Sequence, residues 1–216
     1  MNLAIKAVLS DLDGTLYTSD KFEFEVRKKT LEIVAEKLGI TQSEAKKIIG
    51  ETKKSCITLT RSLDHIGVSR HIFYEELSRR LDYSKFLKPD PRIKDLIDKA
   101  HELGCKFAVI TNSGRPHALR TMNALNLPIS SLDALVTSSE VEPKVSPQPY
   151  LRALELLRVK VNEAIYIGDR TTSEVKPAKE LGIHTVLLSK KKVKSPWADW
   201  VIESPFELID LLRILK

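Results

Sequence analysis

Two aspartates near the start of the chain lie two positions apart, directly after the apolar run 3–9. Alternate residues of a strand project to the same side, so the carboxylates of Asp11 and Asp13 would lie close together and repel each other. A divalent cation removes this repulsion, and hard carboxylate oxygens suit Mg²⁺. Gly14 permits a tight turn or the close approach of a ligand. The pattern predicts a metal-assisted phosphate site, and a capped turn is the ordinary alternative for these residue types.

Polar side chains also follow three later apolar runs. The residues at these positions are Thr111 and Asn112, Lys144, and Asp169 with Glu174 five positions beyond it. In open α/β sheets, ligands bind outside the carboxyl ends of the strands. We therefore expect carboxylates, a hydroxyl and an amine to gather at one edge of a sheet.

Short and nearly continuous apolar runs predict the strands of a buried parallel sheet. We expect five strands and a shorter sixth, at Ala4–Leu9, Lys106–Ile110, Ala134–Val136, Ala164–Ile167, His184–Leu188 and Trp200–Ile202. Helical patterns separate most of them, between Asp90 and Gly104 and at Arg115–Leu125, Pro147–Arg158, Glu174–Leu181 and Phe206–Leu215. This alternation predicts an α/β fold, a doubly wound parallel sheet with right-handed crossovers.

A long stretch without a strand pattern separates the first strand from the second. It carries four helical segments, at Lys21–Leu38, from a capping box at Thr41 through Ile49, at Ser55–Ile66 and at Ser69–Leu81. Four helices of this size can form a small bundle with its own core. We predict a catalytic core of residues 1–17 and 89–216, interrupted by an all-helical insertion at residues 18–88.

The composition of the 216 residues, 42% hydrophobic and 30% charged, is typical of a folded chain with a substantial core. The net charge of +6 is spread over lysine-bearing helices that also carry glutamates, which indicates solvated faces. Cys56 and Cys105 lie in different segments without CxxC spacing, so a reducing compartment is expected. No stretch has transmembrane length, and the N-terminal apolar run lacks a signal-peptide cleavage pattern. We expect a cytoplasmic protein that binds neither membrane nor nucleic acid.

Taken in order, four groups of residues resemble motifs one to four of the haloacid dehalogenase superfamily. They are Asp11-Leu-Asp13-Gly-Thr15, Thr111-Asn112, Lys144 and Gly168-Asp169 with Glu174, and they cover the whole predicted core. The insertion after the first motif is similar to the family's four-helix cap, as in phosphoglycolate phosphatases and pyrimidine nucleotidases. The resemblance implies a Rossmann-like core with a helical C1-type cap. It also implies a Mg²⁺-dependent phosphatase that acts on a small phosphorylated metabolite.

The resemblance implies catalytic and metal-binding roles for three aspartates. Asp11 would attack phosphorus to form an aspartyl-phosphate. Asp13 would protonate the leaving alcohol and then deprotonate the water that hydrolyses the intermediate. Asp11, the backbone carbonyl of Asp13 and Asp169 would hold Mg²⁺, which neutralises charge on the phosphoryl group.

The remaining motif residues are implied to bind the phosphoryl group and support the site. Thr111, the backbone N–H of Asn112 and the ammonium of Lys144 would contact the transferring oxygens. Glu174 stands where the family usually has Asp. It would support the metal through water or steady Lys144, and direct ligation by its longer side chain stays open.

Several other functions share parts of this pattern. The dehalogenase branch usually lacks an acid at the position of Asp13, because halide leaves without a proton, so Asp13 favours phosphate esters. A phosphomutase that returns the phosphoryl group to a sugar stays open. A receiver-like signalling domain is shorter and carries its acceptor Asp after the third strand, where this chain has Ser138-Ser139-Glu140. A basic nucleic-acid binder lacks support, because aromatic and basic residues are not interleaved.

The sequence leaves the substrate and the oligomeric state open. Candidate substrate-facing residues are Tyr17, Lys53, Lys54 and Arg61, for each of which a solvated position is the alternative. Phosphoglycolate and nucleoside monophosphates are the substrates that the resemblance suggests. Both a monomer and a homodimer are compatible with the sequence.

Overall fold

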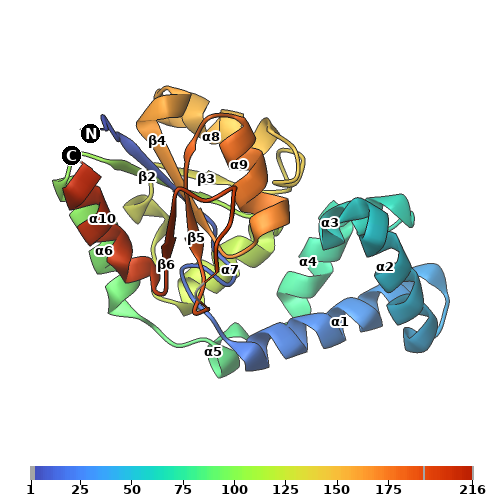
Figure 1. Cartoon of the computed structure of the whole chain (residues 1–216). Helices are drawn as coiled ribbons and strands as arrows, with labels where there is room; N and C mark the ends of the chain where they lie inside the picture. The colour runs from blue at the N-terminus through green and yellow to red at the C-terminus, as the bar shows by residue number, and fades with distance from the viewer. Residues whose placement is uncertain (1–2, 192, 216) are drawn as a thin grey trace.

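The structure is a computed structural model that describes residues 3–191 and 193–215. Its centre is a six-stranded, all-parallel sheet in the order β3-β2-β1-β4-β5-β6 (Figure 1). The strands are β1 (Ala7–Ser10), β2 (Lys106–Ile110), β3 (Ala134–Val136), β4 (Ala164–Gly168), β5 (His184–Leu188) and β6 (Trp200–Ile202). The strand order reverses between β1 and β4, where α/β sheets bind ligands. The predicted doubly wound parallel sheet is confirmed.

Strand β1 begins at Ala7, three residues after the predicted start at Ala4. The backbone N–H of Leu3 donates to the carbonyl of Leu215 at 2.8 Å, and the N–H of Ile5 donates to the carbonyl of Leu3 at 2.9 Å. The N–H groups of Leu3 and Ile5 therefore bond outside the sheet, and Leu3 is attached to the C-terminal helix.

Helices cover both faces of the sheet (Figure 1). Helices α6 (Pro91–Glu102), α7 (Arg115–Ala124) and α10 (Leu208–Leu215) pack on one face, and α8 (Gln148–Leu157) and α9 (Lys176–Glu180) pack on the other. Val8 of β1 belongs to the first core, whereas Ala7 and Leu9 belong to the second. Because both faces are covered, the strand is apolar at successive positions. Among the described residues, no helix combines the length and hydropathy needed to cross a membrane.

The segment after β4 differs from the predicted helix Glu174–Leu181. A π-helical turn, η3 (Thr171–Val175), comes first, and α9 begins only at Lys176. Pro177 lacks the N–H that a regular α-helix across this segment would need. The Glu174 side chain is buried within this wider turn.

The helical insertion lies beside the sheet, between β1 and α6 (Figure 1). Its helices are α1 (Asp20–Leu38), α2 (Gln42–Cys56), α3 (Leu59–His65), α4 (Arg70–Arg80) and the short α5 (Tyr83–Phe86). The capping box at Thr41 is present, but α2 runs beyond the predicted end at Ile49 and includes Ser55. Helix α5 was not predicted, because one turn is too short to show a hydrophobic period. The division into a core and a cap at residues 18–88 stays a prediction.

Candidate active site

The carboxyl ends of β1, β2 and β4 lie side by side because these strands are neighbours in the sheet. Asp11, Thr111 and Asp169 each follow one of these strands directly. Backbone bonds beyond the strands fix two of them. The Asp11 N–H donates to the Ile167 carbonyl at 2.9 Å, and the Thr111 N–H donates to the Val136 carbonyl at 2.9 Å. The strand order therefore brings these polar residues to one edge of the sheet.

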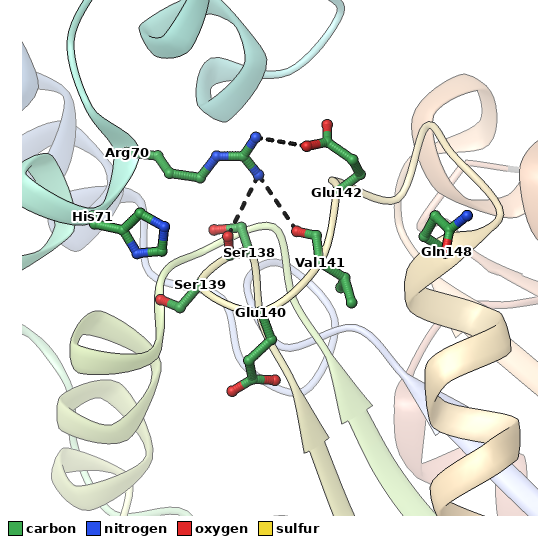
Figure 2. Close-up of a pocket in the computed structure, with 8 residues that line it drawn as sticks. All are labelled: Arg70, His71, Ser138, Ser139, Glu140, Val141, Glu142 and Gln148. Carbon is green, nitrogen blue, oxygen red and sulfur yellow. Dashed lines mark hydrogen bonds and ion pairs between the residues drawn. The ribbon is translucent and has the colours of Figure 1, made fainter.

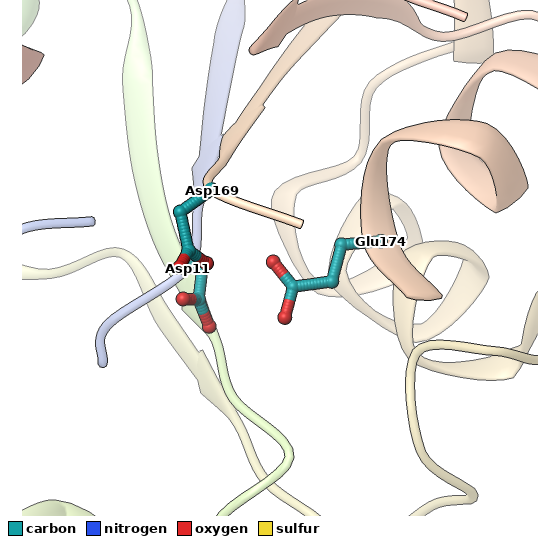
Figure 3. A group of neighbouring side chains, drawn as sticks. All are labelled: Asp11, Asp169 and Glu174. Carbon is teal, nitrogen blue, oxygen red and sulfur yellow. The ribbon is translucent and has the colours of Figure 1, made fainter. Parts of the chain in front are cut away.

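Three carboxylates form the centre of the site (Figure 3). Asp11, Asp169 and Glu174, here called the acid cluster, each offer one oxygen, and these oxygens lie within 4.8 Å of one another. The Oδ1 atom of Asp169 is buried and has no hydrogen-bond partner among the described residues. The Arg170 Nε lies 3.8 Å from it, beyond hydrogen-bond distance. Converging hard oxygens and a buried acceptor without a donor fit a divalent cation.

Lys144 reaches the acid cluster from the loop after β3 and is fully buried. Its Nζ forms ion pairs with Asp11 Oδ1 and, at 3.1 Å, with Glu174 Oε1. Burial alone would lower the pKa of Lys144, but the facing carboxylates of Asp11 and Glu174 outweigh burial and raise it. Lys144 is therefore a charged ammonium held against Asp11.

One ammonium does not neutralise three carboxylates, and the pKa values of the acids reflect the imbalance. Burial, followed by repulsion from Glu174, raises the pKa of Asp11 well above its ordinary 3.8, although Lys144 opposes the rise. Burial and Glu174 raise the pKa of Asp169 as well. A bound cation would favour the ionised forms and displace protons from these acids.

Asp13 is bound by three hydroxyl groups. Its Oδ1 accepts from the Tyr17 hydroxyl at 2.6 Å, and its Oδ2 accepts from Thr111 Oγ1 at 3.1 Å and Ser113 Oγ at 3.0 Å. Burial, and then the negative charge of Asp13, raise the pKa of Tyr17, so this phenol stays a donor. Both carboxylate oxygens of Asp13 are oriented by neutral donors, and no described cation forms an ion pair with them.

The turn after β2 connects the phosphate-binding candidates. Asn112 Oδ1 accepts the backbone N–H of Lys144 at 2.7 Å. Thr111 Oγ1 accepts the backbone N–H of Ser113 at 3.0 Å and donates to Asp13. The structure therefore brings Thr111, Asn112 and Lys144 together beside Asp13.

Two tyrosines near the acid cluster were not singled out by the sequence. The Tyr166 hydroxyl accepts from Lys144 Nζ and donates to Glu174 Oε2, both at 3.2 Å. The Tyr150 hydroxyl lies 2.8 Å from the Glu174 carbonyl and 3.2 Å from the Lys144 carbonyl. A tyrosine in the otherwise aliphatic strand β4 was the available signal, because a buried phenol needs a hydrogen-bond partner.

Two glycines let the carboxylates approach the backbone. Gly14 has a φ of +92°, and a Cβ placed on it would lie 2.7 Å from Asp169 Oδ2. A Cβ on Gly168 would lie 2.7 Å from Glu174 Oε2 and 2.8 Å from the Tyr166 hydroxyl. Any side chain at these positions would collide with the site.

Among the candidate substrate-facing residues of the insertion, Lys53 has the clearest link to the site. Partial desolvation lowers its pKa, and repulsion from Arg170, the neighbour of Asp169, lowers it further. Lys53, Lys54 and Arg61 are all exposed, and their side chains form no hydrogen bond or ion pair with the described residues of the site. The influence of Arg170 on its pKa is what links Lys53 to the core.

Arg70 joins the insertion to the loop that leads to Lys144 (Figure 2). Its guanidinium forms ion pairs with Asp64 of α3 and, at 2.7 Å, with Glu142 of the loop. It also donates to the carbonyls of Ser138 and Val141. A cavity of about 540 Å³ adjoins these contacts, and none of its lining residues belongs to the acid cluster.

A family model described as a haloacid dehalogenase-like hydrolase matches residues 5–182. The chain belongs to the haloacid dehalogenase-like hydrolases. It is 28% identical to a glyceraldehyde 3-phosphate phosphatase of Methanocaldococcus jannaschii, over 98% of this chain and 99% of the relative. It is 27% identical to a phosphoglycolate phosphatase of Aquifex aeolicus, over 96% of this chain and 97% of the relative.

A solved structure shows the same fold in this hydrolase family. It is a phosphatase of Thermococcus onnurineus, with a TM-score of 0.68 and 23% identity over 96% of this chain and 98% of that chain. The family resemblance predicted from the motifs and the predicted class of enzyme, a phosphatase of this family, are confirmed.

Proposed function

We propose that this hydrolase is a Mg²⁺-dependent phosphatase that acts on a small phosphate monoester through an aspartyl-phosphate on Asp11. The observation that carries the proposal is the acid cluster, with a charged Lys144 against Asp11 and a buried Asp169 oxygen that lacks a donor. Asp11, Asp169 and the backbone carbonyl of Asp13 are the proposed ligands. The ion would neutralise charge on the phosphoryl group. Glu174 lies close enough to support the ion directly or through water.

The proposed reaction consists of two displacements at phosphorus. In the first, which requires Asp13 to be protonated, an Asp11 oxygen bonds to phosphorus while the bond to the ester oxygen breaks, and Asp13 gives its proton to the leaving alcohol. Asp13 then takes a proton from water, whose oxygen attacks phosphorus and releases phosphate and free Asp11. Lys144, the Thr111 hydroxyl and the Asn112 N–H would bind the transferring oxygens throughout.

We further propose that α1–α5 form a cap that covers the site and excludes water during the reaction. The contacts of Arg70 with the loop before Lys144 support this role, because they join the helices to the core beside the catalytic groups.

The decisive experiment compares phosphate release by the wild-type protein and Asp11→Asn. With Mg²⁺ and para-nitrophenyl phosphate, we expect the variant to lose roughly 10³-fold or more in kcat, because the nucleophile is removed. Asp210→Asn, at an exposed position in α10, is the matched control and should retain activity. Turnover that survives in Asp11→Asn would remove Asp11 from the nucleophile role.

The same assay separates the competing functions. Phosphoryl transfer to a sugar without release of inorganic phosphate would indicate a phosphomutase. A phosphorylated Asp11 that persists without turnover would indicate a signalling role. Salt-dependent affinity for DNA or RNA without phosphatase activity would indicate a nucleic-acid binder.

The position of Lys53 as an unpaired cation in the described part of the chain favours a substrate that carries a second anionic group besides its phosphate. Lys53 has no ion-pair partner within salt-bridge distance among the described residues, and the cation that most affects it is Arg170. An anionic group bound near both cations would reduce their repulsion. Phosphoglycolate carries such a group, whereas the rest of glyceraldehyde 3-phosphate is uncharged.

We expect Lys53→Met to lower kcat/KM for phosphoglycolate by about tenfold, because a charge pair near the site is lost. The value for glyceraldehyde 3-phosphate should stay within about twofold, because that substrate has no second charge to lose. Lys54→Met is the matched control. Equal losses for both substrates would show that Lys53 does not recognise a second anion.

A further inference from the structure

The turn of residues 111–114, here called the β2 turn, contacts most of the proposed catalytic groups. Thr111 and Ser113 donate to the carboxylate of Asp13, and the Asn112 side chain accepts the backbone N–H of Lys144. A rotation of a peptide in this turn would therefore disturb the proton carrier and the ammonium together.

The backbone carbonyl of Asn112 is held from outside the core, by two hydroxyls of the helical insertion. Thr60 Oγ1 of α3 donates to it at 2.8 Å, and the Tyr74 hydroxyl of α4 donates to it at 3.1 Å. The two hydroxyl oxygens lie 2.9 Å apart, and both residues are buried. Water is therefore largely excluded from this carbonyl, and the insertion supplies its donors.

Tyr74 also contacts the β2 turn at Gly114. Burial raises the pKa of its hydroxyl to about 12, so the phenol stays protonated and able to donate. A Cβ on Gly114 would lie 2.5 Å from the Tyr74 ring. Gly114 has a φ of −71°, which any residue adopts, so the glycine is needed for space.

We infer that Thr60 and Tyr74 are positioning residues that hold the β2 turn in its working conformation. This inference rests on the proposed phosphatase function. The hydroxyls do not touch the reacting atoms. They act through the Asn112 carbonyl, whose peptide orientation sets where the Thr111 hydroxyl and the Ser113 hydroxyl meet Asp13. A cap that supplies these donors completes the active site as well as covering it.

The alternative is that these bonds only dock the insertion on the core. In that case, removing any buried hydroxyl at the interface should lower stability to a similar degree and leave kcat unchanged. Tyr83 provides the comparison, because its hydroxyl bonds to Nδ1 of His117 at 2.7 Å in the same interface without touching the β2 turn. Tyr83→Phe is therefore the matched control for Tyr74→Phe.

The test measures kcat and KM with Mg²⁺ and para-nitrophenyl phosphate for Tyr74→Phe, Thr60→Val and the double variant. We expect kcat of the double variant to fall roughly 10- to 100-fold, because small displacements of catalytic groups are costly. KM should change less than kcat. Thr60→Ser keeps the hydroxyl and should have a kcat close to that of wild type, whereas Thr60→Val should not. Tyr83→Phe should retain the wild-type kcat. A folded double variant with kcat within twofold of wild type, or an equal loss in Tyr83→Phe, would overturn the inference.

A binding measurement keeps this inference separate from the proposed function. Calorimetric titration with orthovanadate and Mg²⁺ reports on the phosphoryl-binding groups without turnover. The double variant should bind about tenfold more weakly than wild type, and Tyr83→Phe should bind as wild type does. If Asp11→Asn retains activity while the double variant binds vanadate more weakly than Tyr83→Phe does, the proposed mechanism is wrong but the positioning role of Thr60 and Tyr74 is supported. Equal affinities in all variants overturn the positioning role alone.

Discussion

Three carboxylates face one ammonium at the carboxyl edge of the sheet, and at the scale of single residues this excess negative charge governs the site. Glu174 is one methylene longer than the Asp usual in the family. Its two oxygens contact Lys144 Nζ at 3.1 Å and the Tyr166 hydroxyl at 3.2 Å. The departure from the family pattern is therefore matched by a tyrosine that binds the longer side chain.

The raised pKa values of Asp11 and Asp169 predict a pH-dependent effect of metal on stability. Without metal, the folded state binds protons more tightly than the unfolded state, so the free energy of unfolding falls as pH rises above the ordinary aspartate value of 3.8. Mg²⁺ would offset this loss. Its increase of Tm should be larger at about pH 7.5 than at about pH 5, measured by calorimetry.

Asp169→Asn should remove most of the Mg²⁺ effect on Tm, whereas Asp210→Asn should preserve it. A metal-induced increase in Tm that is the same at both pH values, or that survives in Asp169→Asn, would contradict a cation held by the acid cluster.

The turn that follows β1 sets the geometry of the site at the scale of secondary structure. The Gly14 N–H donates to the Tyr17 carbonyl at 3.0 Å, which closes the turn and returns the Tyr17 side chain to Asp13. The left-handed φ of Gly14 is needed for this path, and its missing side chain leaves room for Asp169. One residue thus shapes the surroundings of both Asp13 and the acid cluster.

Gly14→Ala should lower the free energy of unfolding by about 1–3 kcal/mol, because a strained φ is imposed on a side chain that also meets Asp169 Oδ2. Urea denaturation measures this change, and the stabilisation by Mg²⁺ should disappear as well. Gly50→Ala in α2 is the control, because nothing lies within 4 Å of the added Cβ. It should raise stability by about 0.5–1 kcal/mol, and a similar gain in Gly14→Ala would refute the crowding argument.

At the scale of the whole molecule, the helical insertion is attached to the core by buried polar contacts as well as by the chain. Arg70 contacts the loop before Lys144, Tyr83 contacts His117 of α7, and Tyr74 contacts the β2 turn. These contacts lie on the α4 side of the insertion. Any movement of the insertion away from that side would have to break them.

Arg70→Gln should lower the free energy of unfolding by about 1–2 kcal/mol, because a largely buried guanidinium loses two carboxylate partners. Arg79→Gln is the control on the same helix, since the Arg79 side chain is 63% exposed and its one ion pair among the described residues is with Glu76. It should change stability by less than about 0.5 kcal/mol. Thermal unfolding of both variants gives the comparison, and equal losses would rule out a special role for Arg70.

Much of the candidate site could be predicted because its residues are marked by short sequence patterns around them. Asp11, Thr111 and Asp169 each follow an apolar run, and parallel strands bring such positions to one edge of the sheet. The start of α6 was predicted for a similar reason, because Asp90 caps the helix and Pro91 occupies its first turn. Local chemistry and hydrophobic period were sufficient at these places.

Other features depended on contacts between distant parts of the chain. Lys144 contacts Asp11 although the two residues are 133 positions apart in the sequence. The hydrogen bond between Tyr166 and Glu174 depends on the π-helical turn in which Glu174 is buried. The single turn α5 and the late start of β1 depend on neighbours that no local pattern reveals.

The succession of strands along the chain, the kinds of polar group at their ends and the family of hydrolases were determined by the sequence itself, because each depends on short runs of residues. The partners of those groups, including the hydroxyls of Thr60 and Tyr74 on the Asn112 carbonyl, were decided only by the tertiary structure. The physical reason is that hydrogen bonds between buried groups depend on distances of a few ångströms, which packing of the whole chain sets.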